Sequence, residues 1–150
     1  MAAQPTPEPG EHRSTLADVA PVSWAVMQLA HAQRAIAAQR LAELGLFPGQ
    51  ELILAQLWSV DGSSQKELCG RLGLDHSTVA KSVQRLEKSG LVRRERSAAD
   101  GRVTLVQLTD AGRRLEAPVH DIWRDLERRW AALDPAESER FAGLVRSLLG

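Results

Sequence analysis

The side chains that stand out in this sequence are suited to binding rather than to breaking bonds, and they lie on one predicted helix at residues 76–89. At about 100° per residue, Val79, Val83 and Leu86 gather on one side of that helix. The other side and its edges carry hydroxyls, an amide and three cations: Ser77, Thr78, Lys81, Ser82, Gln84, Arg85 and Lys88. Cations meet phosphates and guanine edges, and small polar groups allow close approach. We therefore predict that this face enters the major groove of double-stranded DNA.

Two short helices must position that face. Ser64 and Glu67 match a capping box, in which each side chain satisfies a backbone N–H of the first helical turn. The helix that they open ends at Gly73, a residue type that accepts the left-handed conformation. Asp75 is a good cap for the helix that follows. Two short helices joined by about three residues indicate a helix-turn-helix.

A basic hairpin follows these helices. Residues 92–96 and 103–108 are short runs typical of β-strands, and residues 97–101 between them predict a turn that Gly101 permits. Arginine on a thin protrusion can enter the minor groove, where the negative potential is deep. We expect Asp100 to hold the guanidinium of Arg102 through a bidentate pair. The DNA-contacting residues predicted on the helix and the hairpin are His76, Ser77, Thr78, Lys81, Ser82, Arg85, Arg94, Arg96, Asp100 and Arg102.

Longer helices are predicted on both sides of this segment. An apolar stripe predicts one from Val22 to near Gly45, and Pro48 opens a second one. Thr109 is placed to cap another helix, which Pro118 should kink. The apolar stripe of the first helix consists of Val22, Val26, Leu29 and Ile36. The apolar seam of the Thr109 helix consists of Leu115, Val119, Ile122 and Leu126. Asp134 caps a last helix, whose predicted inward face consists of Phe141, Leu144, Val145 and Leu148.

Composition fits one ordinary globular domain. The chain has 150 residues, of which 43% are hydrophobic, and its 19 basic residues balance 19 acidic ones. Residues 64–104 nevertheless hold nine basic and five acidic side chains, so a basic middle lies between acidic flanks. Residues 1–16, rich in Pro, Thr, Glu and Gly, are expected to be a disordered arm, and residues 17–150 a single domain.

Several classes of protein are excluded by what the sequence lacks. The longest stretch without charged residues, residues 19–33, is too short and too polar for a membrane span, and the chain shows no signal peptide pattern. We therefore expect a cytoplasmic location. One cysteine cannot form an internal disulfide, and four scattered histidines match no metal site. No catalytic or phosphate-binding motif is present, so we expect neither an enzyme nor a cofactor.

Three runs, in this order, resemble one known family. They are the "LEKSGLVRR" run at 86–94, the Asp-x-Arg at 100–102 and the "LTDAG" helix start at 108–112. Together with residues 65–68 and 72–79, they look like MarR-type winged-helix transcription regulators over about residues 44–113. The family often has Thr-Pro where this chain has Phe47-Pro48, and often Pro where His76 stands.

The resemblance implies a mainly α-helical fold with a small β-hairpin wing. A winged helix-turn-helix core at about 46–112 would be flanked by N- and C-terminal dimerisation helices at 17–45 and 113–150. The family forms homodimers that bind a pseudo-palindromic operator, and many members release DNA when a small phenolic or aromatic effector binds. The residues placed to contact an effector are Trp24, His31 and Trp58.

Two alternatives stay open from the residues alone. A winged helix can bind protein, although the predicted outward face lacks the aromatic or aliphatic anchors of such a surface. Cys69 could be a redox sensor, although its position after Leu68 in a short helix favours a buried structural thiol. The favoured interpretation is a dimeric DNA-binding regulator, most simply a repressor released by its effector.

Overall fold

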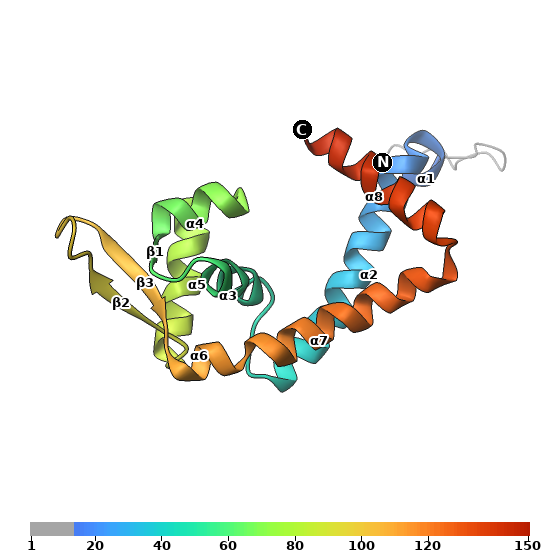
Figure 1. Ribbon diagram of the computed structural model, residues 1–150. Helices are drawn as coiled ribbons and strands as arrows, with labels where there is room; N and C mark the ends of the chain where they lie inside the picture. Colours follow the sequence, from blue (N-terminus) through green and yellow to red (C-terminus); the bar gives the residue numbers. More distant parts are fainter. Residues whose placement is uncertain (1–13) are drawn as a thin grey trace, which may run out of the picture. The chain divides into compact units, whose positions relative to one another are not determined.

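The computed structural model describes residues 14–150 (Figure 1). Most of the predicted disordered arm, at residues 1–13, lies outside the described residues. The chain forms two compact units, which divide after Arg34. Within the described part of the chain, no helix is long and apolar enough to span a lipid bilayer.

The first unit contains a short helix and the start of a long one. Helix α1 (Leu16–Val19) begins with a capping box, in which Thr15 accepts the N–H of Asp18 and the Asp18 carboxylate accepts the N–H of Thr15. Helix α2 (Pro21–Glu43) starts one residue before the predicted position and crosses the boundary between the units. Val22, Val26 and Leu29 are all exposed in the single chain.

The second unit holds the remaining elements, which alternate helices with three short strands. In chain order they are α3 (Gln50–Ser59), β1 (Ser63–Ser64), α4 (Gln65–Leu72), α5 (His76–Lys88), β2 (Val92–Arg96), β3 (Thr104–Leu108), α6 (Asp110–Arg114), α7 (Glu116–Glu127), the 3-10 helix η1 (Arg128–Ala132) and α8 (Pro135–Leu149). The mainly helical fold class with a hairpin wing is confirmed. The wing is defined here as β2, β3 and the loop between them, residues 92–108.

The strands form a small antiparallel sheet in the order β1-β3-β2 (Figure 1). Strand β2 pairs with β3 from Val92 opposite Leu108 to Arg96 opposite Thr104. The two-residue strand β1 adds to the free edge of β3, with Ser63 opposite Val106. The sequence predicted the hairpin but not this third strand, which joins the start of α4 to the wing.

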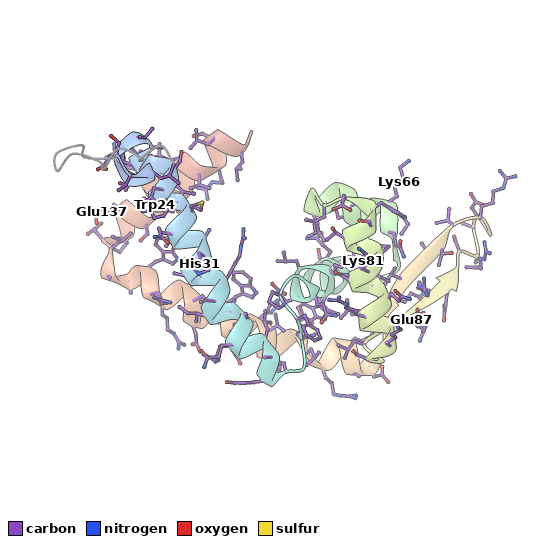
Figure 2. The ribbon with its side chains drawn as sticks, turned by 180° about the vertical axis from the view of Figure 1, so that it is seen from behind. Trp24, His31, Lys66, Lys81, Glu87 and Glu137 are labelled. Carbon is purple, nitrogen blue, oxygen red and sulfur yellow. The ribbon has the colours of Figure 1, made fainter. Side chains whose placement is uncertain are left out.

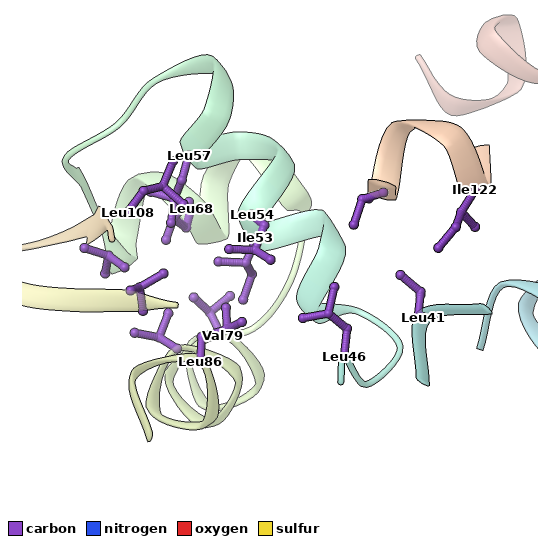
Figure 3. Packing of buried hydrophobic residues seen from close by; sticks show 14 of the residues in the cluster. Leu41, Leu46, Ile53, Leu54, Leu57, Leu68, Val79, Leu86, Leu108 and Ile122 are labelled. Atoms are coloured by element: carbon purple, nitrogen blue, oxygen red, sulfur yellow. The ribbon is translucent and has the colours of Figure 1, made fainter. Parts of the chain in front are cut away.

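The core is one cluster of leucine, isoleucine and valine side chains (Figure 3). Val79, Val83 and Leu86 are completely buried, as the periodicity of α5 predicted. Figure 3 shows Leu57, Leu68 and Leu108 together at one end of the cluster. At the other end Leu41 of α2 faces Ile122 of α7. Because α5 and the strands share this cluster, the exposed face of α5 has a fixed place beside the wing.

Side-chain caps set most helix starts as predicted. Ser64, Asp75, Thr109 and Asp134 each accept a backbone N–H in the first turn of α4, α5, α6 and α8. Helix α3 differs, because it begins two residues after Pro48, behind Gly49 with a φ of 94°.

Two predictions about the C-terminal helices were wrong. The helix capped by Thr109 ends after five residues, and the break falls at Leu115 instead of Pro118. Pro118 lies in the first turn of α7, where the missing N–H has no helical acceptor in any case. The predicted inward face of α8 does not enter the core of its own chain; its exposed fractions are 37%, 56%, 37% and 86% at Phe141, Leu144, Val145 and Leu148.

Candidate nucleic-acid interface

The start of α5 is organised by the carboxylate of Asp75. Its Oδ1 accepts the Thr78 N–H at 3.0 Å and the Ser77 hydroxyl at 2.7 Å, and its Oδ2 accepts the Thr78 hydroxyl at 2.6 Å. Hydrogen bonds from the Thr78 and Ser77 hydroxyls, followed by that of the Thr78 N–H, hold the pKa of Asp75 far below its usual range. The first turn of α5 is therefore fixed before any partner arrives.

The outward face of α5 is open to solvent. The predicted contact residues His76, Ser77, Thr78, Lys81 and Arg85 are exposed, whereas Ser82 is half-buried. Figure 2 shows Lys81 midway along α5 and Glu87 further along the same helix. Within residues 14–150, neither Lys81 nor Arg85 forms an ion pair. Their charges are thus available to an anionic ligand.

Arg85 has one neighbour that the sequence did not indicate. The carbon at the centre of its guanidinium lies 5.8 Å from the ring centre of Phe47, in the segment between α2 and α3. Phe47 is 61% exposed, so the ring extends the outward face of α5 with an aromatic group. A tertiary contact of this kind leaves no periodic signal in the sequence.

The wing arginines are divided between internal contacts and the solvent. Arg94 donates to the Glu87 carboxylate of α5 at 2.6 Å, and this contact lowers the pKa of Glu87. Arg96 donates to the Gly101 carbonyl at 2.8 Å across the loop. Arg102 is exposed at the tip, and no ion pair of the described chain includes it. Of the three predicted wing cations, Arg102 is therefore the most readily available.

The loop of the wing does not use the predicted Asp100–Arg102 side-chain pair. The Asp100 carboxylate instead accepts the backbone N–H of Arg102 at 3.0 Å. Ser97 accepts the N–H groups of Ala99 and Asp100 at 3.3 Å, which closes the turn from the other side. Gly101 is not among the glycines with positive φ in the described residues, so the turn does not depend on that conformation. Local turn bonds of an Asx type replace the bidentate pair.

The base of the wing is held by the carboxylate of Asp61, which was not among the predicted site residues. Asp61 accepts the backbone N–H of Leu108 at 2.9 Å and pairs with Arg113 at 2.7 Å. Burial raises its pKa, but the bonds from Leu108, Arg113 and Gly62 together bring it below the usual value. Asp61 thus ties the end of α3 to the end of β3 and to α6.

Comparison with known proteins agrees with this geometry. A model of the MarR family matches residues 44–103. The HTH-type transcriptional regulator TtmR of Methylorubrum extorquens is 42% identical over 93 residues, which is 62% of this chain and 48% of TtmR. The uncharacterised HTH-type regulator YdgJ of Bacillus subtilis is 34% identical over 86 residues, 57% of this chain and 52% of YdgJ. The chain spans about half the length of these curated relatives.

Similarity to solved structures extends over most of the chain. A probable transcriptional regulator from Pseudomonas aeruginosa is 30% identical, with a TM-score of 0.77 over 85% of this chain and 96% of that one. The chain belongs to the MarR family. A mutant MarR from E. coli, solved in complex with operator DNA, shows the same fold at 20% identity, with a TM-score of 0.83 over 92% of this chain and all of that one. MarR family transcription regulators are not enzymes.

The residues predicted to contact an effector lie in different units of this MarR-family chain. Trp24 is half-buried and His31 exposed in the first unit, while Trp58 lies in α3 of the second. Trp58 donates to the Gly112 carbonyl at 3.1 Å and contacts His120 edge to face at 5.6 Å. An open hollow of about 340 Å³ beside this pair is lined by His120, Trp123, Arg124 and Glu127.

Cys69 is a free, half-buried thiol in α4 that packs against the core. The thiol is therefore less buried than predicted, although it packs against the core. Within the described residues, no group of three or more His, Cys, Asp or Glu side chains could hold a metal ion.

Proposed function

We propose that this chain is a dimeric, sequence-specific DNA-binding transcription regulator that works in the cytoplasm. The observation that carries the proposal is the exposed polar and basic face of α5, held between a capped start and a basic wing. A helix of this kind fits the major groove, while Arg102 at the wing tip is suited to the adjacent minor groove. Solved relatives include an S. aureus MepR–DNA complex and reduced AbfR bound to DNA.

Two copies of the chain are proposed to form the DNA-binding unit. In the single chain, helices α2 and α8 expose apolar side chains to water, namely those of Val22, Val26, Leu144 and Leu148. A hollow of about 330 Å³ beside α8, lined by Trp130, Phe141 and others, adds apolar surface there. Two-fold symmetry would give each α5 one half-site of a pseudo-palindromic operator, and the centres of the two half-sites would lie about one turn of the DNA double helix apart.

The test begins by selecting duplexes from a random DNA library with the purified protein. A regulator should enrich a pseudo-palindrome and bind it with an affinity that falls steeply with salt, because phosphate contacts release counterions. Failure to enrich any sequence would contradict the proposal. Binding to a protein partner with little salt dependence would favour the protein-interaction alternative.

Lys81 and Arg85 give the proposal residue-level detail. If Arg85 pairs with a guanine edge, Arg85→Ala should cost about 1–3 kcal/mol and relax the preference at one base position. Lys81 is a point charge, so Lys81→Ala should weaken binding to selected and scrambled duplexes alike. Equal losses on both duplexes for both variants would contradict the assignment of Arg85 to a base.

We further propose that the regulator is a repressor released by a small aromatic compound. A solved relative, Bordetella bronchiseptica BpsR, is described as regulated in DNA binding by 6-hydroxynicotinic acid, and it is 24% identical to this chain. The predicted contact residues are Trp24, His31 and Trp58, and coupling between effector and DNA is typically about 1–3 kcal/mol. A panel of phenolic and acidic aromatics should therefore quench tryptophan fluorescence and weaken operator binding. A panel that does neither would contradict this part of the proposal.

A further inference from the structure

We infer that Phe47 is the positioning residue for Arg85 in base recognition, an inference that rests on the proposed DNA-binding function. Phe47 lies 38 residues before Arg85, yet its ring faces the guanidinium at 5.8 Å. The ring is 61% exposed and lies outside the buried core cluster. A large aromatic side chain at this point therefore adds little to packing, but it lies within cation–ring range of the guanidinium that we assign to a guanine.

The segment that carries Phe47 is fixed on both sides of the ring. Leu46, immediately before it, is 2% exposed and packs into the core (Figure 3). The Phe47 N–H donates to the side-chain oxygen of Gln50 at 2.9 Å, and the Phe47 carbonyl accepts the Gln50 N–H at 3.0 Å. Gln50 is itself only 3% exposed. The backbone of Phe47 is thus locked by a reciprocal pair of bonds to a buried residue.

A second buried side chain closes the same segment. The Glu51 carboxylate accepts the N–H of Gly49 at 2.7 Å, and Glu51 is 6% exposed. Gly49 has a φ of 94°, which turns the chain sharply before α3. Two buried polar side chains in succession therefore hold a short connection that presents one exposed ring. Such a connection keeps the ring at a defined place beside α5.

The chemistry of the pair suits base recognition. Arginine donates from the edges of a planar group, so a ring that covers one face leaves the N–H donors free for guanine O6 and N7. A guanidinium held against a ring also loses less conformational freedom when it docks than one that samples many rotamers. Lys81 on the same helix has no aromatic partner among the cation–ring contacts of the described residues. Phe47 therefore acts on Arg85 and on the base it reads, not on phosphate attraction in general.

The experiment compares Phe47→Leu and Phe47→Trp on three probes: the selected duplex, duplexes with single base changes, and a scrambled duplex. An exposed cation–ring contact corresponds to roughly a two- to fivefold change in affinity, and tryptophan is the best ring for it. We expect Phe47→Leu to lose this factor on the selected duplex, mainly as reduced discrimination at the base position that Arg85→Ala identifies. Phe47→Trp should keep the discrimination, and scrambled DNA should bind all variants equally.

The double variant separates positioning from a merely structural role. In the Arg85→Ala background, Phe47→Leu should have no further effect on discrimination. Leu52→Ala removes another exposed apolar side chain, on α3, and should leave the base preference unchanged. The inference would be overturned if Phe47→Leu reduced affinity as much in the Arg85→Ala background as in the unmodified chain. It would also be overturned if Phe47→Leu reduced affinity for scrambled DNA as much as for the selected duplex. If the unmodified chain selects no sequence at all, the proposed function fails instead, so the two failures are distinguishable.

Discussion

Replacing Gly112 by alanine should destabilise the second unit, because this glycine of α6 packs against Leu91 in the turn between α5 and β2. A Cβ at Gly112 would lie well under 3.0 Å from the Leu91 carbonyl oxygen and 3.1 Å from Cδ2 of Leu108. The neighbour is backbone, so it cannot turn aside as a flexible side chain would. The Leu91 carbonyl also accepts the N–H of Thr109 at 3.1 Å, and the Gly112 carbonyl accepts the Trp58 indole N–H at 3.1 Å.

The size of the effect follows from these contacts. Relieving the clash requires the two backbone segments to separate by on the order of 1 Å, and overpacking of this kind costs about 1–3 kcal/mol. The separation also weakens the Thr109–Leu91 and Trp58–Gly112 hydrogen bonds, each contributing about 1 kcal/mol. We therefore expect a loss of about 3–5 kcal/mol out of a total stability of about 5–15 kcal/mol. In a protein of this length, that corresponds to a decrease in Tm of roughly 6–20 °C.

Urea and thermal denaturation followed by far-UV circular dichroism measure the loss, at one fixed protein concentration because dimerisation shifts the apparent stability. The matched control is Gly70→Ala in α4, where an added Cβ meets nothing within 4 Å. That control should gain up to about 1 kcal/mol from better helix propensity. A Gly112→Ala protein with the unfolding midpoint of the unmodified chain would refute the reasoning.

Four further substitutions test the wing, its contact with α5 and the dimer. Arg102→Ala should weaken operator binding, most on operators with A·T-rich flanks, and should lower the slope of log affinity against log salt by roughly one. Asp100→Ala should also weaken operator binding, because it frees the loop of the wing. Tighter binding by Asp100→Ala would contradict the positioning role of Asp100. Because Arg94 lowers the pKa of Glu87, their contact stabilises the fold above pH 4.5, the ordinary value, and is lost as the pH falls through the lowered pKa. The urea midpoint of the Glu87→Gln protein should therefore fall less on acidification than the urea midpoint of the unmodified chain. Leu148→Arg should convert a dimer into a monomer in sedimentation velocity, and a monomeric parent protein would contradict the proposed assembly.

Features that depend on a few neighbouring residues were predictable from the sequence. The caps at Ser64, Asp75, Thr109 and Asp134 bond within three residues of their own position, so composition and spacing identify them. The buried side of α5 followed from a single helical period. These local signals placed most of the candidate interface on the correct element.

Features that depend on distant contacts were not predictable in this way. Strand β1 has two residues, too few for a period, and exists because Ser63 lies opposite Val106. Arg94 was predicted to face DNA, but it reaches Glu87 on a different element. The predicted pairing of Asp100 failed for the opposite reason, since a backbone N–H two residues away competes with the longer arginine side chain.

The cap of α5 restricts what its first turn can offer to a base pair. Both hydroxyl hydrogens, of Ser77 and Thr78, point to the Asp75 carboxylate, so these groups present only lone pairs to an approaching partner. The same carboxylate occupies the helix N-terminus, where an anion such as phosphate would otherwise bind. In a complex that keeps this arrangement, the Ser77 and Thr78 hydroxyls can only accept hydrogen bonds, which in the major groove come from the amino groups of adenine N6 or cytosine N4. Lys81 and Arg85, further along α5, supply donors instead, so the hydroxyls of the first turn and the cations of the later turns read opposite hydrogen-bonding patterns.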